Sequence, residues 1–491
     1  MNKYKKLLQN TGLVAIGTFG SKILTFLMVR FYTECLTASE YSTADLLMQT
    51  AKLLIPILCL GITETVFRFA LDRDADAREV FTAGLLVIAA GSALFALIIP
   101  LFRSIGFFHD YTYILVAYIT CSNLHSLATQ YIRTKDHYRF YALQGLLNTA
   151  LTIIFNLVFL LLFKWGIKGY LLAVVGADFI AFLVVFIHEK LWRDILSPKK
   201  IHAKKIKEML RYSIPLIPTT VFWWITSSSD HYMVKYFSGD TMNGLYTAAY
   251  KIPSLLVMIC TIFIQAWNFS AVVERDERER TAFFSKVFDI YQSILFCACS
   301  AIILFSQVIA KVLFAREYYS SWKYIPLLCA ATVFSCFVTF VGSVYTVRKK
   351  SMFSFVTAMV GALTNIILNL LLIPSPSAIE KLPQTLWFLK KLPLAGLGAT
   401  GAAIATLASY LVVFVIRAVS VRHYVPFDLK IPKVMLAVGA ITAQSLVMSC
   451  NIPCWYILSG ILFLFVAVLN IRPIIEGLDR MIFHRGSAQV E

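Results

Sequence analysis

Hydrophobic residues in this chain form long runs, and most polar residues lie in the short stretches between them. An apolar run of about twenty residues is long enough to cross the hydrocarbon core of a bilayer as one α-helix. Fourteen such runs can be marked in the 491 residues. Their predicted bounds are Thr11–Thr33, Asp45–Phe67, Val80–Leu101, Thr112–Ile132, Phe140–Phe163, Gly169–His188, Tyr212–Tyr236, Gly244–Val273, Val287–Ile309, Trp322–Val347, Ser351–Ile373, Gly396–Ile416, Val434–Cys450 and Trp455–Ile471. The pattern predicts an all-α polytopic membrane protein with about 14 transmembrane helices.

The composition supports this class and excludes a soluble protein. Apolar residues (AVILMFWYC) make up 59% of the chain, and only 15% of the residues are charged. Soluble proteins carry about 25% charged residues, so this chain has too few charges to cover a surface that faces water. The same apolar excess excludes a disordered chain. The ten cysteines and eight histidines lack the spacing typical of metal ligands, so no metal site is predicted.

The net charge of +18 follows the predicted topology and does not indicate a nucleic-acid partner. The termini and the alternate loops on their side hold 31 of the 45 Lys and Arg residues, whereas 10 lie in or beside the opposite loops. Cytoplasmic loops of membrane proteins are enriched in Lys and Arg. We therefore expect a multi-pass protein of the cell (cytoplasmic) membrane with both termini in the cytoplasm.

An internal repeat relates the two halves of the chain. The segment 151–159, which contains Asn156, resembles the segment 364–372, which contains Asn369. Further along, the sequence Leu-Val-Val-Phe occurs both at 183–186 and at 411–414. Six spans per half is an even number, so both halves enter the membrane from the same side. The repeat predicts two parallel six-helix repeats around a central cavity, plus two extra helices.

The repeat also gives the expected domains. They are an N-terminal six-helix bundle at 1–189, a basic cytoplasmic linker at 190–211, a C-terminal six-helix bundle at 212–417, and helices 13–14 with a cytoplasmic tail at 418–491. The linker is basic and amphipathic, which predicts an interfacial helix that lies on anionic membrane lipid.

Basic residues inside the predicted spans are the first candidates for a binding site. Lys22, Arg30, Lys52 and Lys251 lie within spans, and Arg68 lies at a span end. A charged side chain costs roughly 3 kcal/mol or more at the centre of a membrane helix. These residues therefore predict a cationic cavity for an anionic substrate. The alternative for each is a long side chain that reaches the headgroups at the membrane surface.

Acidic, aromatic and amide side chains supply further candidates. Asp178, Asp230 and Glu64 are candidates for cation coupling or, alternatively, for ion pairing within the protein. Candidates for contact with a sugar or a lipid are Trp223, Trp224, Trp267, Asn156 and Asn369. Interfacial aromatic residues and amides that join helices are the structural alternatives. No cofactor is predicted, and the sequence does not choose between H⁺ and Na⁺ as a coupling ion.

Several short motifs resemble those of a known family. They are Glu40-Tyr-Ser42, Leu60-Gly61 with Arg68, Tyr212-Ser-Ile-Pro215-Leu-Ile-Pro218, Ser229-Asp230 and Asn243-Gly244-Leu-Tyr246-Thr-Ala-Ala-Tyr250-Lys251. Together they resemble the polysaccharide transporter family, which includes flippases of oligosaccharide or O-antigen repeat units. This family belongs to the multidrug/oligosaccharidyl-lipid/polysaccharide flippase superfamily. The resemblance covers essentially the whole chain, although Ser42 stands where relatives often have Gly, and His231 where they have Arg.

The resemblance implies a flippase that moves a polyprenyl-diphosphate-linked oligosaccharide across the cytoplasmic membrane by alternating access. It implies that the chain is not an enzyme and serves cell-surface polysaccharide biosynthesis, with other polysaccharide-assembly proteins as candidate partners. One alternative is a drug or cation antiporter of the related multidrug branch. Another is a membrane polysaccharide polymerase or ligase, which would need larger loops with catalytic groups than this chain has.

Overall fold

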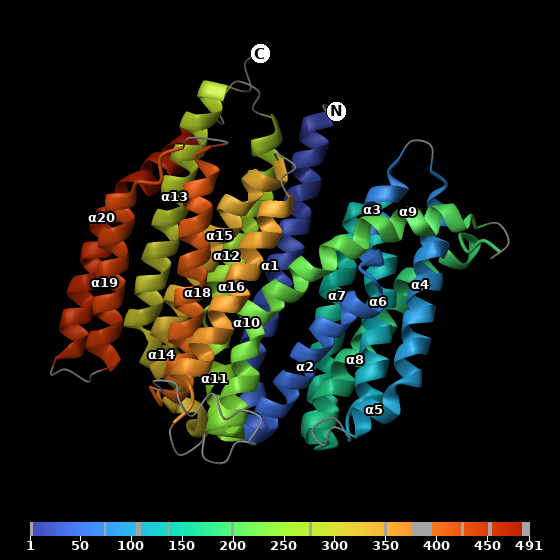
Figure 1. The fold of residues 1–491 in the computed structure, drawn as a ribbon, viewed down its shortest axis with the longest axis horizontal. Coiled ribbons are helices and arrows are strands. Elements are labelled where there is room, and N and C mark those ends of the chain that lie inside the picture. The colour runs from blue at the N-terminus through green and yellow to red at the C-terminus, as the bar shows by residue number, and fades with distance from the viewer. Residues whose placement is uncertain are drawn as a thin grey trace. The chain divides into compact units, whose positions relative to one another are not determined.

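A computed structural model describes residues 3–72, 75–104, 110–135, 137–197, 201–273, 277–347, 351–375, 395–423, 427–449 and 454–483. Every regular element in these ranges is helical (Figure 1). The α-helices are α1 (Lys3–Cys35), α2 (Ala38–Leu58), α3 (Ile62–Ala70), α4 (Ala77–Leu97), α5 (Ile99–Arg103), α6 (Thr112–Thr134), α7 (Tyr138–Asn156), α8 (Gly166–His188), α9 (Ala203–Ser213), α10 (Ile217–Ser238), α11 (Asp240–Lys251), α12 (Ser254–Val273), α13 (Glu277–Leu304), α14 (Ser306–Leu313), α15 (Ile325–Val347), α16 (Ser351–Leu372), α18 (Gly398–Val421), α19 (Ile431–Ser449) and α20 (Trp455–Phe483). Short 3₁₀ or π turns lie at Leu157–Leu162, Leu191–Arg193, Ile214–Leu216 and Arg316–Tyr324.

The prediction of an all-α multi-pass membrane protein is confirmed. Each of the fourteen predicted spans overlaps a helix or a run of helices. Within the described residues, ten helices are long and apolar enough to cross a membrane, and the bent pair α2–α3 makes an eleventh. The predicted spans at 11–33, 112–132 and 212–236 correspond to the helices α1, α6 and α10. The helices α6 and α10 are more polar than the ten counted, and the side chains of the first part of α1 lie outside the described residues. The number 14 therefore stays a prediction.

The helices group into two compact units with similar internal packing. Unit 1 is Met1–Trp224, and unit 2 is Ile225–Glu491. In unit 1, α8 packs on α6 and α7, and α4 packs on α6. In unit 2, α18 packs on α15 and α16, and α13 packs on α15. These three pairings thus occur in the same order in both units. The division between the units falls inside α10, and the predicted domain bounds stay a prediction.

Two helices of unit 1 begin at capping residues. Thr37 and Glu40 form a reciprocal capping box at the start of α2, which satisfies two backbone N–H groups that the helix leaves open. Asp76 caps α4 by accepting a hydrogen bond from the backbone of Arg78. Hydrogen bonds from the Arg78 side chain also hold the pKa of Asp76 below its usual range.

A break within the second predicted span shapes the core of unit 1. The helices α2 and α3 meet at an angle of 50°. Leu60 and Gly61 between them adopt positive φ angles of 51° and 66°. On the neighbouring helix α4, Gly91 lies against this break, so that a Cβ at position 91 would overlap the carbonyl oxygen of Leu58. The absence of a side chain at Gly91 therefore allows the close approach of α4 to α2.

Polar contacts gather the basic-rich loops of unit 1 at one end of its helices. The backbone N–H and Nδ1 of His202, just before α9, lie 2.9 and 3.0 Å from the carboxylate of Glu79. The Lys135 ammonium lies 2.6 Å from the carboxylate of Asp194. The helix α9 runs across this end and packs on α3 and α4 (Figure 1). The loops that the charge pattern assigns to the cytoplasm are thus neighbours, as a common side of the membrane requires.

In unit 2, the helices α19 and α20 pack against α13 through buried polar groups. The Gln444 amide on α19 accepts a hydrogen bond from Ser300 of α13 at 2.7 Å and donates one to Ser459 of α20 at 3.0 Å. Lys433 and Asp289 add an ion pair of 2.7 Å between α19 and α13. Since lipid gives apolar helix surfaces little reason to associate, such bonds are an effective way to hold two extra helices on a bundle.

An arginine joins three helices of unit 2. The sequence pattern ended the twelfth span at Ile416, but α18 continues to Val421 and buries Arg417 to 3% exposure. The guanidinium donates hydrogen bonds to the Val338 carbonyl on α15 at 2.8 Å and to the Thr357 hydroxyl on α16 at 2.9 and 3.0 Å. It also stacks on the Tyr345 ring. The helix thus extends five residues beyond the predicted span, and these bonds compensate the burial of the charge.

We expect Gly91→Ala to destabilise the protein, because the added methyl group would overlap Leu58 and force α4 away from α2. Overpacking of this kind typically costs about 1–3 kcal/mol. Gly439→Ala is the matched control, since a Cβ at this exposed position on α19 meets no atom within 4 Å. Thermal melts in detergent should show a lower midpoint for Gly91→Ala only. Equal midpoints for both variants would contradict the proposed close approach.

We also expect Arg417→Lys to lower the melting midpoint, because an ammonium cannot reproduce the forked donors that reach both α15 and α16. The loss of one such charged hydrogen bond costs about 1.5–3 kcal/mol. Arg422→Lys, at an exposed position just after α18, is the control and should melt like the wild-type protein. If Arg417→Lys melts at the wild-type temperature, the arginine does not fasten the three helices.

Candidate functional site

Each unit contains a cluster of buried polar side chains, and these clusters are the best candidates for functional sites within the units. The unit 2 cluster consists of Asp230, Tyr246, Asn365 and Thr406 with their direct neighbours. The unit 1 cluster consists of His125, Gln144, Asn148 and Asp178.

The unit 2 cluster surrounds the carboxylate of Asp230 with neutral hydrogen-bond donors. Asp230 on α10 has 0% of its surface exposed. One of its oxygens accepts hydrogen bonds from the Tyr246 hydroxyl at 2.7 Å and the Thr406 hydroxyl at 3.1 Å. Its other oxygen accepts a bond from the backbone N–H of His231 at 3.0 Å. A buried carboxylate needs such donors, and α10, α11 and α18 all supply them.

Two asparagines on α16 extend this cluster. Asn365 accepts a hydrogen bond from Ser229 of α10 at 2.8 Å, and its amide lies 3.5 Å from the Thr406 hydroxyl. Asn369, one turn further along α16, donates a bond to Asn365 at 2.8 Å. The side-chain oxygen of Asn369 is buried, and within the described residues it accepts no hydrogen bond. Carboxylate, hydroxyl and amide oxygens are ligands for hard cations, and a carboxylate can alternatively hold a proton.

The unit 1 cluster contains a histidine and an acid. His125 on α6 lies 3.3 Å from the Asp178 carboxylate through Nδ1 and 2.7 Å from the Gln144 side-chain oxygen through Nε2. Asn148, one turn beyond Gln144 on α7, donates a hydrogen bond to Asp178 at 2.9 Å. Of the two expectations for Asp178, the geometry provides the partners for ion pairing. No group of three or more His, Cys, Asp or Glu side chains in the described ranges is arranged to hold a metal ion.

The internal repeat aligns the two clusters but not their acids. When the Leu-Val-Val-Phe segments at 183–186 and 411–414 are superposed in sequence, Asp178 stands opposite Thr406. Both residues belong to the polar cluster of their own unit. The acid comes from α8 in unit 1 and from α10 in unit 2. The position of the cluster is thus common to both units, and the helix that supplies the carboxylate is not.

The basic residues predicted from the sequence occupy different environments. Lys22 on α1 and Lys251 at the end of α11 are half-buried. Arg30 pairs with Glu34, one turn along the same helix, and its side chain is 42% exposed. Lys52 is exposed and lies 3.4 Å from the Gln49 side chain.

Arg68 joins α3 to the last turn of α9. It donates a hydrogen bond to the Tyr212 hydroxyl at 2.8 Å and stacks over the ring at 4.4 Å. Four of the five predicted cations, all but Lys251, lie in unit 1, and none of them is one of the four side chains that define the unit 1 cluster. A common cationic cavity therefore stays a prediction.

The remaining candidates are also spread over several places. Glu64 is exposed on α3. Asn156 and Asn369, which the repeat aligns, are both fully buried. Trp223 is half-buried, and Trp224 donates a hydrogen bond to the Gln49 carbonyl at 2.9 Å. The side chain of Trp267 lies outside the described residues. Contact of these side chains with a sugar or a lipid stays a prediction.

Sequence reasoning missed most of the partners in the two clusters. His125, Gln144 and Asn148 were not singled out, because isolated polar residues barely lower the hydropathy of a span. Thr406 and Asn365 likewise lie in strongly apolar helices. The repeat contained a signal that could have identified Thr406. Its alignment places Thr406 opposite Asp178, which the sequence had already singled out.

Comparison with known proteins identifies the family. A sequence profile of the family described as "Polysaccharide biosynthesis protein" matches residues 7–269, more than half of the chain. Among proteins with curated function, none matches the chain in sequence.

Several solved structures share the fold. One is a lipid II flippase, MurJ, in an inward closed conformation, with a TM-score of 0.63 and 16% identity; the match covers 95% of this chain and 100% of that one. A second is a multidrug resistance MATE family transporter of the MOP superfamily in an outward-facing conformation, with a TM-score of 0.62, 16% identity and coverage of 86% and 96%. A third is a MOP superfamily transporter from Pyrococcus furiosus, with a TM-score of 0.59, 15% identity and coverage of 85% and 95%.

The family match agrees with the motifs read from the sequence, and the structural matches agree with the helical architecture. The chain therefore belongs to the polysaccharide biosynthesis protein family and has the fold of MOP-superfamily transporters.

Proposed function

We propose that the chain is a flippase that moves a polyprenyl-diphosphate-linked oligosaccharide from the inner to the outer leaflet of the cytoplasmic membrane. The single observation that carries this proposal is the family match over residues 7–269. The repeated helix pairings of units 1 and 2 support it, since parallel repeats suit alternating access, in which bundles move as rigid bodies. The product would be a lipid-linked unit available for cell-surface polysaccharide assembly.

The family match also ranks the alternatives. A drug or cation antiporter would share the fold, because MATE transporters resemble this chain as closely as the lipid II flippase does. At 16% identity that resemblance concerns the fold alone, whereas the sequence profile belongs to polysaccharide biosynthesis. A polymerase or ligase would need catalytic groups on sizeable loops, so transport is favoured over an enzymatic reaction.

The cargo's diphosphate explains why cations are retained within the spans. Burial of a diphosphate at bilayer depth without counter-charges is prohibitive. Lys22 and Lys251, the two half-buried lysines of the predicted set, are our candidates for this role. Lys52 and Arg68, which are exposed, are candidates for an earlier encounter with the headgroup.

We assign the coupling of transport to the unit 2 cluster. Asp230 is fully buried and accepts hydrogen bonds from hydroxyl and backbone donors, whereas the carboxylate of Asp178 lies directly against the ring of His125. Binding of a proton or Na⁺ at Asp230 would alter its bonds to Tyr246 and Thr406 and hence the packing of α10 on α11 and α18. Such a change at one buried charge can shift a conformational equilibrium.

We expect Asp230→Asn to reduce export about ten- to a hundredfold, because the coupling charge is lost while the shape of the side chain is kept. This range corresponds to about 1.5–3 kcal/mol for a charge-assisted contact. Export would be measured as surface polysaccharide in cells, before and after collapse of the proton or Na⁺ gradient. The control is Asp289→Asn, which removes the carboxylate that pairs with Lys433 and lies outside the cluster.

The decisive result is the response to the gradient. Asp230→Asn should leave the remaining export insensitive to the collapse, whereas Asp289→Asn should respond like the wild-type protein. Normal, gradient-sensitive export by a well-expressed Asp230→Asn variant would contradict the assignment of coupling to Asp230.

We expect Lys22→Gln to cripple export and Lys22→Arg to retain part of it, because charge rather than size would neutralise the diphosphate. Loss of one charged contact should lower affinity by about one to two decades. Lipid-linked units should then accumulate in the inner leaflet. The measurements are surface polysaccharide, lipid-linked intermediates and the amount of protein in the membrane.

Lys168→Gln, at an exposed position at the start of α8, removes the same charge as a control and should export normally. The strongest test is the double variant Lys22→Gln, Lys251→Gln. Full export by this variant at normal protein levels would refute a diphosphate-binding role and favour an uncharged or cationic cargo.

A further inference from the structure

The helix α9 is held on unit 1 at both ends and along one face. Met209 and Ser213 are buried, with exposures of 0% and 1%, and Met209 belongs to the core formed with α3 and α4. His202 bonds to Glu79 just before the helix begins. Next to the end of the helix, Tyr212 bonds to Arg68. The helix therefore presents its opposite face in a fixed orientation.

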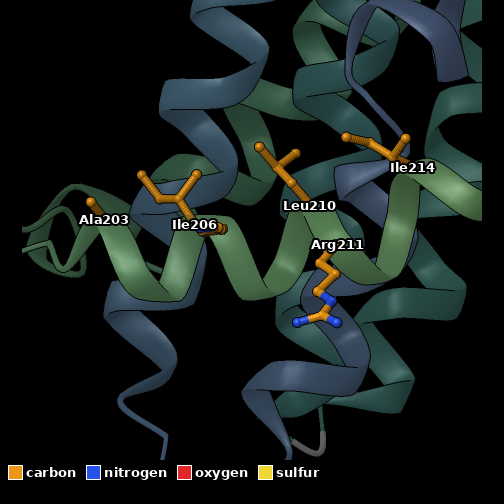
Figure 2. A pocket seen from close by; sticks show the side chains of 6 residues that line it. Ala203, Ile206, Leu210, Arg211 and Ile214 are labelled. Carbon is orange, nitrogen blue, oxygen red and sulfur yellow. The ribbon is translucent and has the colours of Figure 1, made fainter.

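Two parallel rows of side chains run along the rest of the helix, and Ile206 and Leu210 of the apolar row also pack against the edge of the unit 1 core. Residues one turn apart along a helix lie on the same side. One row is Ala203, Lys207 and Arg211, and the other is Ile206, Leu210 and Ile214. Figure 2 shows the isoleucine and leucine side chains on one side of α9 and the Arg211 guanidinium on the other. The rows border an open groove of about 490 Å³.

The groove combines a partly exposed apolar row with exposed cations. Ile214 is 46% exposed, and Ile206 and Leu210 are only partly buried. Lys207 and Arg211 are exposed and lie one turn apart, which brings two positive charges close together. An apolar row gains free energy when hydrocarbon covers it, by roughly 25 cal/mol per Å² of surface. An arginine and a lysine together suit a phosphate, the first as a fork and the second as a point charge.

A ligand that satisfies both rows must carry a phosphate and a hydrocarbon chain in one molecule. A nucleotide or a phosphorylated peptide would engage the cations and leave the isoleucine row in water. A fatty acid chain alone would cover that row and leave the cations without an anion. The helix α9 lies across the end of unit 1 where the basic-rich loops gather. The predicted topology places this end at the cytoplasmic surface of the membrane, where phospholipid headgroups lie.

We propose that the groove of α9 binds one anionic phospholipid, with its phosphate between Lys207 and Arg211 and an acyl chain along Ile206, Leu210 and Ile214. The lipid comes from the leaflet at the basic end of unit 1. This site is separate from the buried clusters and does not depend on the proposed flippase function. It makes the packing of α9 on α3 and α4 responsive to the charge of the surrounding membrane.

Native mass spectrometry of the full chain can test the site, with defined phosphatidylglycerol or phosphatidylcholine added to the detergent-solubilised protein. The wild-type protein should retain one phosphatidylglycerol in preference to phosphatidylcholine. The Lys207→Gln, Arg211→Gln variant should bind phosphatidylglycerol about thirtyfold more weakly. This factor follows from about 1 kcal/mol for each basic residue near an anionic surface.

The control is Arg193→Gln, Lys204→Gln. It removes the same charge from exposed positions on the same linker that do not border the groove, and it should bind like the wild-type protein. Ile214→Ser should weaken binding of the whole lipid and leave its preference for phosphatidylglycerol intact. Melting midpoints within about a degree of each other would show that all variants are folded.

Three results would overturn the proposal. The first is equal retention of phosphatidylglycerol by the two double variants. The second is equal retention of the two lipids by the wild-type protein. The third is displacement of phosphatidylglycerol by millimolar inorganic phosphate, which would show that the groove takes a free phosphate instead of a lipid. None of these measurements involves transport, so they remain valid if the chain carries a different cargo.

Discussion

A charge inside the hydrocarbon layer loses its water, and only protein groups can replace that hydration. Asp230 receives hydrogen bonds from a tyrosine, a threonine and a backbone amide on three segments of unit 2. Arg417 donates hydrogen bonds to a carbonyl and a hydroxyl on two further helices. In each case one ion fixes the relative positions of several helices. Buried polar contacts thus join several helices of unit 2.

The two units surround their buried acids with different side chains, at positions that the repeat aligns. In unit 1, Asp178 faces a histidine on α6 and an asparagine on α7. In unit 2, Thr406 occupies the aligned position, and the acid of the cluster is Asp230 on α10. The repeat thus preserves where polar groups meet and changes their identity. Different ion chemistry in the two units would let one bundle respond to an ion while the other keeps its packing.

The sequence contained most of the fold and much less of the site. Runs of about twenty apolar residues locate the helices, because the thickness of the bilayer fixes their length. The pairing of Arg30 with Glu34 was also within reach, since residues four apart share a helix face. The contact of Asp230 with Thr406 could not be predicted in this way, because 176 residues separate the two and no local sequence pattern indicates that they are in contact. Arg417 was missed because a span was ended at the charge, and only the contacts with α15 and α16 show why the helix continues.

The contacts between the loops of unit 1 have a consequence for how the protein is made. Glu79 bonds to His202, which follows it by 123 residues, and Lys135 pairs with Asp194, which follows by 59. Ribosomes add about 5–20 residues per second, so the first spans are in the membrane for roughly 6–25 s before the partner of Glu79 has been synthesised. During that interval the ends of α3, α4 and α6 lack the segment that later joins them. The contacts that join these helix ends can form only after residues 190–211 have been synthesised. By then all six predicted spans of unit 1 have been inserted.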